Sequence, residues 1–155
     1  MRKKESLEKN INLDWVLKGE IAVGPAPRSF TDVSILKKNH IVGILSLCSL
    51  DEIDFKENLS DYFKFKRFIL PDHKYKNDLT IEQLNQSLNY LEELKELGPV
   101  YVHCVAAKER SPLVCMGWLV KKHNLTPTQA LDYMMEIHKG TNPLPKQFNL
   151  LKLIK

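Results

Sequence analysis

Short apolar runs alternate along the chain with longer amphipathic segments. Residues 41–47 form an apolar run, which is typical of a buried strand. Residues 100–103 predict a second short strand, and residues 12–23 predict one or two more. Aromatic and basic side chains alternate over residues 62–68, which predicts a strand with one exposed face.

The amphipathic segments have the period of a helix. Across residues 80–97, leucine or isoleucine recurs every three or four positions until Gly98 and Pro99 end the pattern. Further helices are expected at residues 31–39 with Thr31 as a cap, at 111–124, from Thr126 to about His138, and after Pro145.

Helices and strands thus alternate along a chain of 155 residues, which is the length of one domain. With 43% apolar and 27% charged residues, the composition is that of a globular protein. We find no internal repeat or linker, so residues 1–155 are expected to form a single domain. The predicted fold is α/β, with a central mixed, partly parallel sheet flanked by helices, and we expect a monomer.

Several protein classes become improbable. The longest apolar stretch, residues 112–120, is too short to span a membrane, and no apolar region follows the basic N-terminus as in a signal peptide. Three cysteines do not suggest a secreted disulfide framework. A net charge of +4 suits an anionic ligand but is too small to indicate nucleic-acid binding. We therefore expect a cytoplasmic protein.

The most informative segment, residues 102–112, contains Cys104, Arg110 and Ser111. A strand delivers the cysteine to a short loop, and the arginine follows where a helix begins. Backbone N–H groups of such a loop bind anions, and a guanidinium can grip two phosphate oxygens. The positive surroundings favour the thiolate form of Cys104, which is a nucleophile. A buried cysteine beside a surface arginine is the plainer alternative, but the three residues together in this setting favour a phosphate site.

The sequence His103, Cys104, five residues, Arg110, Ser111 resembles the signature of the cysteine-based protein tyrosine phosphatases, above all the small dual-specificity branch. The resemblance extends from Gly24 to the last helix. It implies a strand–phosphate loop–helix site and hydrolysis of phosphate monoesters through a phosphocysteine, with no metal and no cofactor. The side chains or amides of the loop would bind the substrate: Val105, Ala106, Ala107, Lys108, Glu109 and Arg110.

The resemblance also implies an aspartate about thirty residues before the cysteine. Asp72 meets this requirement, and we assign it as the general acid that protonates the leaving oxygen and later activates water. A turn aspartate is the plainer alternative, Asp78 is the next candidate, and Asp61 is a weaker one. Ser111 would donate a hydrogen bond to the cysteine sulfur when it leaves.

Two loop residues depart from the family pattern. Ala107 stands where most relatives have glycine, so a positive φ there would cost on the order of 1 kcal/mol. Glu109 places a negative charge next to Arg110. We expect its side chain to point outward, where it could hold Arg110 in place.

Three more residues have both a plain and a functional interpretation. Lys108 and His73 occupy positions that in tensin-like phosphoinositide phosphatases read additional phosphates; otherwise they are solvated side chains. Cys48 follows a predicted central strand, and in those lipid phosphatases such a cysteine can form a reversible disulfide with the nucleophile. Otherwise it is a core residue, as we expect for Cys115.

Three hypotheses follow. The first is a phosphatase acting on phosphotyrosine in proteins or peptides, with phosphoserine and phosphothreonine as further candidate substrates. The second is a phosphatase for phosphoinositides or other small phosphate esters. The third is a weakly active phosphate-binding module, which Ala107 and Glu109 alone favour.

Overall fold

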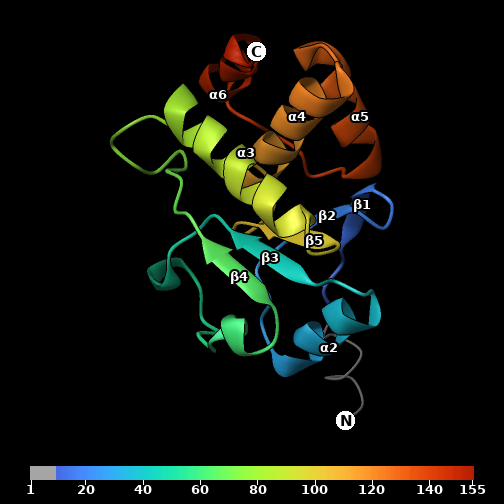
Figure 1. Cartoon of the computed structure of the whole chain (residues 1–155). Helices are drawn as coiled ribbons and strands as arrows, with labels where there is room; N and C mark the ends of the chain where they lie inside the picture. The colour runs from blue at the N-terminus through green and yellow to red at the C-terminus, as the bar shows by residue number, and fades with distance from the viewer. Residues whose placement is uncertain (1–9) are drawn as a thin grey trace.

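A five-stranded mixed sheet forms the centre of the protein, whose computed structural model describes residues 10–155 (Figure 1). The spatial order is β1-β2-β5-β3-β4; β1 is antiparallel to β2, and the other neighbours are parallel. The strands are β1 (Asp14–Leu17), β2 (Ile21–Gly24), β3 (Gly43–Ser46), β4 (Lys64–Arg67) and β5 (Val100–His103). The predicted α/β class with a partly parallel sheet is therefore confirmed.

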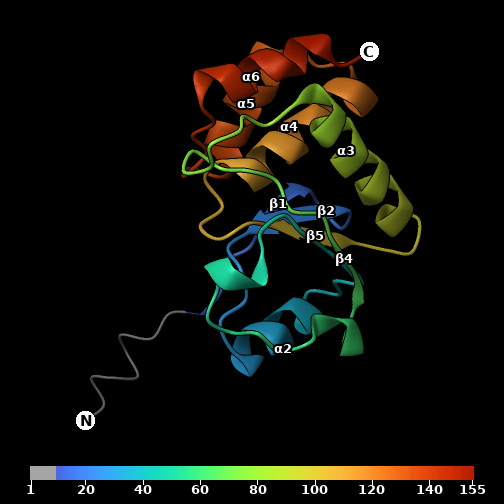
Figure 2. The ribbon, with the colours of Figure 1, turned by 90° about the vertical axis from the view of Figure 1, so that its left-hand side faces the viewer.

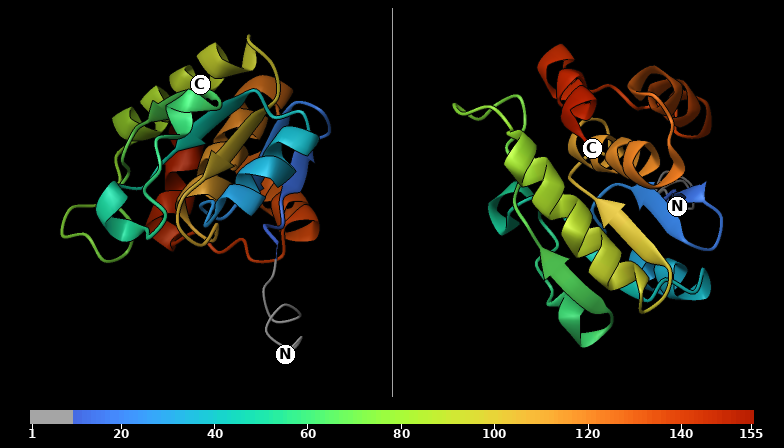
Figure 3. Two further views of the ribbon diagram at one scale, coloured as in Figure 1. Left: turned by 90° about the horizontal axis from the view of Figure 1, so that it is seen from below. Right: turned by 45° about the horizontal axis from the view of Figure 1, so that its top comes forward.

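Helices cover both faces of this sheet. Figures 1 and 2 show α2 on one side and the other four α-helices on the opposite side. The right panel of Figure 3 shows α3 and α4 crossing that second face. The α-helices are α2 (Phe30–Lys38), α3 (Ile81–Lys95), α4 (Arg110–His123), α5 (Pro127–Ile137) and α6 (Pro145–Leu150), and the 3₁₀ helices are η1 (Leu50–Glu52), η2 (Leu59–Asp61) and η3 (Leu151–Leu153).

Successive strand residues point to opposite faces and so supply two cores. In β5, Val100 and Val102 pack in the larger core under α3, α4 and α5, whereas Tyr101 belongs to the smaller core with residues of α2. Because β5 is central and covered on both faces, all four of its residues are buried. This burial explains why apolar side chains predominate in the segment that predicted the strand.

Helix ends differ little from those predicted, with one correction. The N-cap of α2 is Ser29, whose hydroxyl accepts a hydrogen bond from the Asp32 amide, and Thr31 lies inside the helix. Thr80 and Thr126 each form a capping box with the glutamine three residues later. Only residues 64–67 of the predicted strand at 62–68 pair with a neighbour, as the edge strand β4.

The parallel strands end at one edge of the sheet, and four loops meet there. They follow β2, β3, β4 and β5. Backbone hydrogen bonds join them: the Ala26 amide donates to the Val105 carbonyl, and the Leu70 amide donates to the Leu47 carbonyl. Ligands of open α/β sheets bind at this edge. No helix among residues 10–155 has the length and apolar character needed to cross a membrane.

Candidate active site

The loop between β5 and α4 turns its carbonyl groups outward. The Cys104 and Val105 carbonyls accept hydrogen bonds from His103 Nδ1 and the Ala26 amide, respectively. The Ala107 and Lys108 carbonyls are bound by His138 Nε2 and the Asn142 amide, at 2.6 and 2.7 Å. Since a carbonyl and the next N–H point in opposite directions across a trans peptide, outward carbonyls direct the following amides inward. No amide of residues 105–109 donates to an acceptor within residues 10–155, so these amides are available for an anion.

Ala107 adopts the left-handed conformation, with φ of +59°. Its side chain is buried, in a position where a glycine would be less strained. The positive φ that the sequence analysis considered at this position is therefore present.

Cys104 lies at the base of a pocket of about 560 Å³ whose lining includes Asp72, Lys108 and Arg110. The cysteine is only 3% exposed. Its sulfur lies 3.2 Å from the hydroxyl of buried Ser111, in the first turn of α4. The hydroxyl can thus donate a hydrogen bond to a thiolate, as the sequence predicts.

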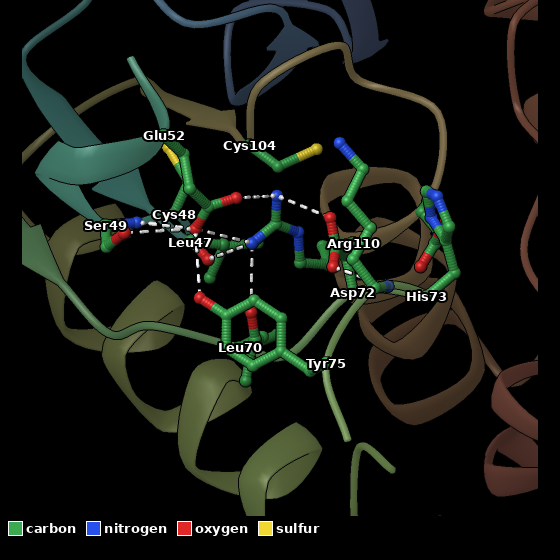
Figure 4. Close-up of polar contacts among 12 residues, drawn as sticks. Leu47, Cys48, Ser49, Glu52, Leu70, Asp72, His73, Tyr75, Cys104 and Arg110 are labelled. Carbon is green, nitrogen blue, oxygen red and sulfur yellow. Dashed lines mark hydrogen bonds and ion pairs between the residues drawn. The ribbon is translucent and has the colours of Figure 1, made fainter. Parts of the chain in front are cut away.

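Arg110 extends from the start of α4 between two carboxylates (Figure 4). Its Nη2 lies 2.8 Å from Glu52 Oε1 and 3.8 Å from Asp72 Oδ2. Nη1 donates to Glu52 Oε2 and to the Leu47 and Leu70 carbonyls. The buried Nε has no acceptor within residues 10–155, which leaves one donor directed at no protein group. These contacts fix the guanidinium before a ligand arrives.

Sequence reasoning missed Glu52. The carboxylate on η1 is the one that holds Arg110, and Glu109 does not take this role. Burial alone would raise the pKa of Glu52, but hydrogen bonds from Arg110 and Ser49 lower it overall. Burial alone would lower the pKa of Arg110, because it disfavours the charged form. The hydrogen bond to Glu52 and the charge of nearby Cys104 raise the pKa overall. The only signal for Glu52 in the sequence was an acidic residue shortly after a central strand.

Asp72 lies in the loop after β4 and lines the Cys104 pocket. Its Oδ1 accepts a hydrogen bond from the Lys74 amide, which holds the carboxylate in its turn. Asp78 is instead exposed and pairs with Lys146, and Asp61 ends η2 beside a different cavity. The structure thus brings Asp72, and neither alternative, together with Cys104.

Glu109 connects three elements of the site. Its Oε2 lies 2.8 Å from His73 Nδ1, and its Oε1 accepts a hydrogen bond from Gln147 on α6 at 3.0 Å. The side chain thus contacts both the loop of Asp72 and α6. Lys108 and His73 both line the pocket and are exposed to solvent.

His103 is buried behind the cysteine. Desolvation lowers its pKa to about 4, although its hydrogen bond to the Cys104 carbonyl opposes the shift. The ring is therefore neutral near pH 7, and its Nδ1 donates to that carbonyl. Its Nε2 has no partner within residues 10–155.

The remaining cysteines are also buried. Cys48 follows β3, on the strand adjacent to the one that ends at Cys104, and burial raises the pKa of its thiol. Cys115 lies within α4 in the larger core, and burial also raises its pKa. Within residues 10–155, no cluster of histidine, cysteine or carboxylate side chains could hold a metal ion.

The sequence and fold resemble those of known phosphatases. A rat phosphatidylglycerophosphatase and protein-tyrosine phosphatase 1 is 26% identical over 146 residues, covering 90% of this chain and 75% of the relative. The dual specificity protein phosphatase 1 of Arabidopsis thaliana is 29% identical over 112 residues, covering 71% of this chain and 53% of the relative.

Two solved structures share the fold. The crystal structure of PTPMT1 has a TM-score of 0.78 at 20% identity, with 92% of this chain and 93% of that chain covered. For DUSP15 the TM-score is 0.72 at 19% identity, with coverage of 91% and 85%. At these identities the two structures establish the fold alone.

The family model described as "Dual specificity phosphatase, catalytic domain" matches residues 28–154. That range contains the cysteine loop, Asp72, Glu52 and every helix of the larger core. This chain therefore belongs to the dual specificity phosphatase catalytic domain family.

Proposed function

We propose that the protein hydrolyses phosphate monoesters in two steps. The thiolate of Cys104 attacks phosphorus, and Asp72 gives a proton to the departing oxygen. Water then attacks the phosphocysteine, Asp72 accepts a proton from that water, and the thiolate leaves with inorganic phosphate as the product. The observation that carries this proposal is the convergence of Cys104, Arg110, Asp72 and the free loop amides on one pocket.

Each remaining group has a place in these steps. The loop amides and the guanidinium of Arg110 stabilise the charge on the equatorial phosphoryl oxygens. Arg110 Nε, which has no hydrogen-bond partner among residues 10–155, supplies a further donor. Ser111 stabilises the thiolate as it leaves in the second step, because its hydroxyl lies 3.2 Å from the sulfur.

The preferred substrates are phosphotyrosine residues in proteins or peptides, with phosphoserine and phosphothreonine as further candidates. A small anionic ester such as a phospholipid headgroup is the second possibility, because Lys108 lines the pocket and relatives carry the name phosphatidylglycerophosphatase. The engagement of His73 by the Glu109 carboxylate argues against a headgroup with several phosphates. That carboxylate would repel additional phosphate groups at this side of the pocket.

Hydrolysis of an aryl phosphate between about pH 5 and 8, with reductant and chelator present, tests the reaction. We expect turnover by the wild-type protein, none with Cys104→Ser, and a loss of roughly 10²- to 10⁴-fold with Asp72→Asn. Asp78→Asn removes the exposed carboxylate of the same loop and should have no effect. No turnover by folded, reduced wild-type protein would contradict the proposal.

A substrate panel then separates the two classes. Phosphotyrosine peptides, phosphoinositide vesicles and phosphatidylglycerophosphate vesicles would be compared with the wild type and Lys108→Ala. Preference for peptides, little changed by the substitution, supports a protein substrate. Preference for a lipid that is lost in Lys108→Ala supports the second class.

A further inference from the structure

His138 connects the phosphate loop to the far edge of the sheet. It is the C-cap residue of α5, and only 8% of it is exposed. Its Nε2 lies 2.6 Å from the Ala107 carbonyl oxygen and its Nδ1 lies 2.6 Å from Asp14 Oδ2 on β1. The hydroxyl of buried Thr141 donates to the His138 carbonyl at 2.8 Å, which fixes the backbone from which the ring extends.

Both partners of this ring can only accept hydrogen bonds. A carbonyl oxygen has no proton to give, and neither does an ionised carboxylate, so each ring nitrogen must donate. A neutral imidazole has a single N–H and can satisfy just one of the two contacts. With Asp14 ionised, an imidazolium at His138 satisfies both contacts, whereas a neutral ring satisfies one.

The contact with Ala107 determines the direction of an amide inside the loop. The Ala107 carbonyl and the Lys108 N–H belong to one trans peptide and point in opposite directions. Holding the carbonyl outward keeps the Lys108 amide turned towards the anion site. Ala107 is also the residue in the left-handed conformation, which an alanine adopts only at a cost in free energy.

We propose that the His138 imidazolium, held by Asp14, is a positioning residue that orients the Lys108 amide for binding the phosphoryl group. The inference rests on the proposed phosphate site. Loss of one proton from the ring removes one hydrogen bond, and anion affinity falls as the carbonyl is released. The charged group in contact with the ring is Asp14 on β1. Lys108 comes next to Ala107 in the loop, Lys139 follows His138 in the sequence, and Tyr133 on α5 donates to the Val16 carbonyl of β1.

Sulfate binding tests the proposal without any turnover. Sulfate remains a dianion throughout the range of pH used, and Cys104→Ser removes the titrating thiol. NMR spectra of that protein follow the His138 ring nitrogens, while the Lys108 and Glu109 amides report the sulfate dissociation constant at each pH. We expect the dissociation constant to rise about tenfold as His138 loses a proton, because a hydrogen bond to a charged donor is lost.

Three further variants, each also carrying Cys104→Ser, make the test specific. His138→Gln keeps a donor that does not titrate, so the pH step should disappear while binding persists. Asp14→Asn removes the carboxylate that holds Nδ1 and should weaken sulfate binding, because the ring is then held less firmly against the Ala107 carbonyl. His123→Gln changes an exposed histidine at the end of α4 and should behave as its parent.

Two results would overturn the proposal: a ring that carries one proton at every pH measured, or a pH step that persists unchanged in His138→Gln. The first result is read from protein with an intact His138, so the proposal can be tested even if His138→Gln does not fold. If wild-type protein fails to hydrolyse an aryl phosphate yet the Cys104→Ser protein shows the pH step in sulfate binding, the hydrolytic function fails and the positioning role stands. If the wild-type protein hydrolyses the aryl phosphate but sulfate binding shows no pH step, the hydrolytic function stands and the positioning role of His138 fails.

Discussion

Arg110 illustrates how single residues are prepared for their chemistry. Only 2% of it is exposed, yet its charge is retained because Glu52, Asp72 and two carbonyls surround the guanidinium. A buried charge without partners would cost several kcal/mol. The side chain is therefore ordered during folding. Its guanidinium is already oriented when a phosphoryl group binds.

His103 leads to a prediction on stability. Its pKa is about 4 in the folded protein against 6.5 in an unfolded chain, so the unfolded state binds more protons between these values. The free energy of unfolding should decrease as the pH falls from about 6.5 to 4, by up to about 3 kcal/mol. Urea unfolding at several pH values measures the change.

A His103→Asn variant is the control for this prediction. It cannot titrate in the window, so its unfolding free energy should depend less steeply on pH. Glu52 also loses its favourable ionised form in acid, but it does so in both proteins. Equal slopes for the two proteins would show that His103 is not the group responsible.

At the scale of elements, the site depends on the side-chain contacts that connect its loops to one another. Glu109 bridges the loop of Asp72, through His73, and α6, through Gln147. None of these elements is a neighbour of another in the sequence. The loop of Asp72 is thus held against the cysteine loop by side chains that local propensity does not identify.

Removing this bridge should misplace Asp72, the proposed general acid. His73 is largely exposed, so the interaction is modest, and Glu109→Ala should lower kcat by about two- to fivefold. The loss should grow with poorer leaving groups, because these need the proton from Asp72. Steady-state kinetics with a series of aryl phosphates measures both effects.

Lys146→Ala supplies the matched comparison. It breaks the exposed ion pair with Asp78, which joins the same loop to the same helix. Its kinetics should equal those of the wild type. An equal loss in both variants would indicate general loosening of the loop rather than a role for Glu109.

At the scale of the whole molecule, the sheet order decides which residues meet. β3 and β5 are far apart in the sequence but adjacent in the sheet, with Ser46 opposite His103. Cys48 and Cys104 therefore follow the ends of neighbouring parallel strands. Arg110, Glu52 and Asp72 likewise come from segments after three different strands.

This adjacency supports the predicted redox role of Cys48. Hydrogen peroxide would convert the Cys104 thiolate to sulfenic acid, and the Cys48 sulfur would then attack it, releasing water and forming a disulfide. After peroxide treatment and reduction, wild-type protein should regain most of its activity, whereas Cys48→Ser should lose it irreversibly. Since burial raises the pKa of Cys48, protection should improve with rising pH.

Cys115→Ser is the control, because Cys115 is equally buried but lies within α4. It should recover as the wild type does. If Cys48→Ser also recovers fully, Cys48 is a core residue and has no redox role.

The local sequence alone determined the elements and the central chemistry. Apolar runs, periodic leucines and capping boxes act within a few residues, so they marked most strands and helices before any contact was known. The cysteine loop was equally evident, because its proposed nucleophile, its amides and its arginine lie within a single strand–loop–helix segment. Thr31 was wrong as a cap because Ser29 offers its hydroxyl to the same first turn.

Only the tertiary structure decided how the loop is supported. Glu52 binds Arg110 across 58 residues, and His138 binds the Ala107 carbonyl across 31. Neither residue has a local pattern that predicts its partner. Their positions depend on strand order and helix packing, which bring the ends of distant segments to one edge of the sheet. The sequence thus determined what the loop can do, and the fold decided which residues hold it in place.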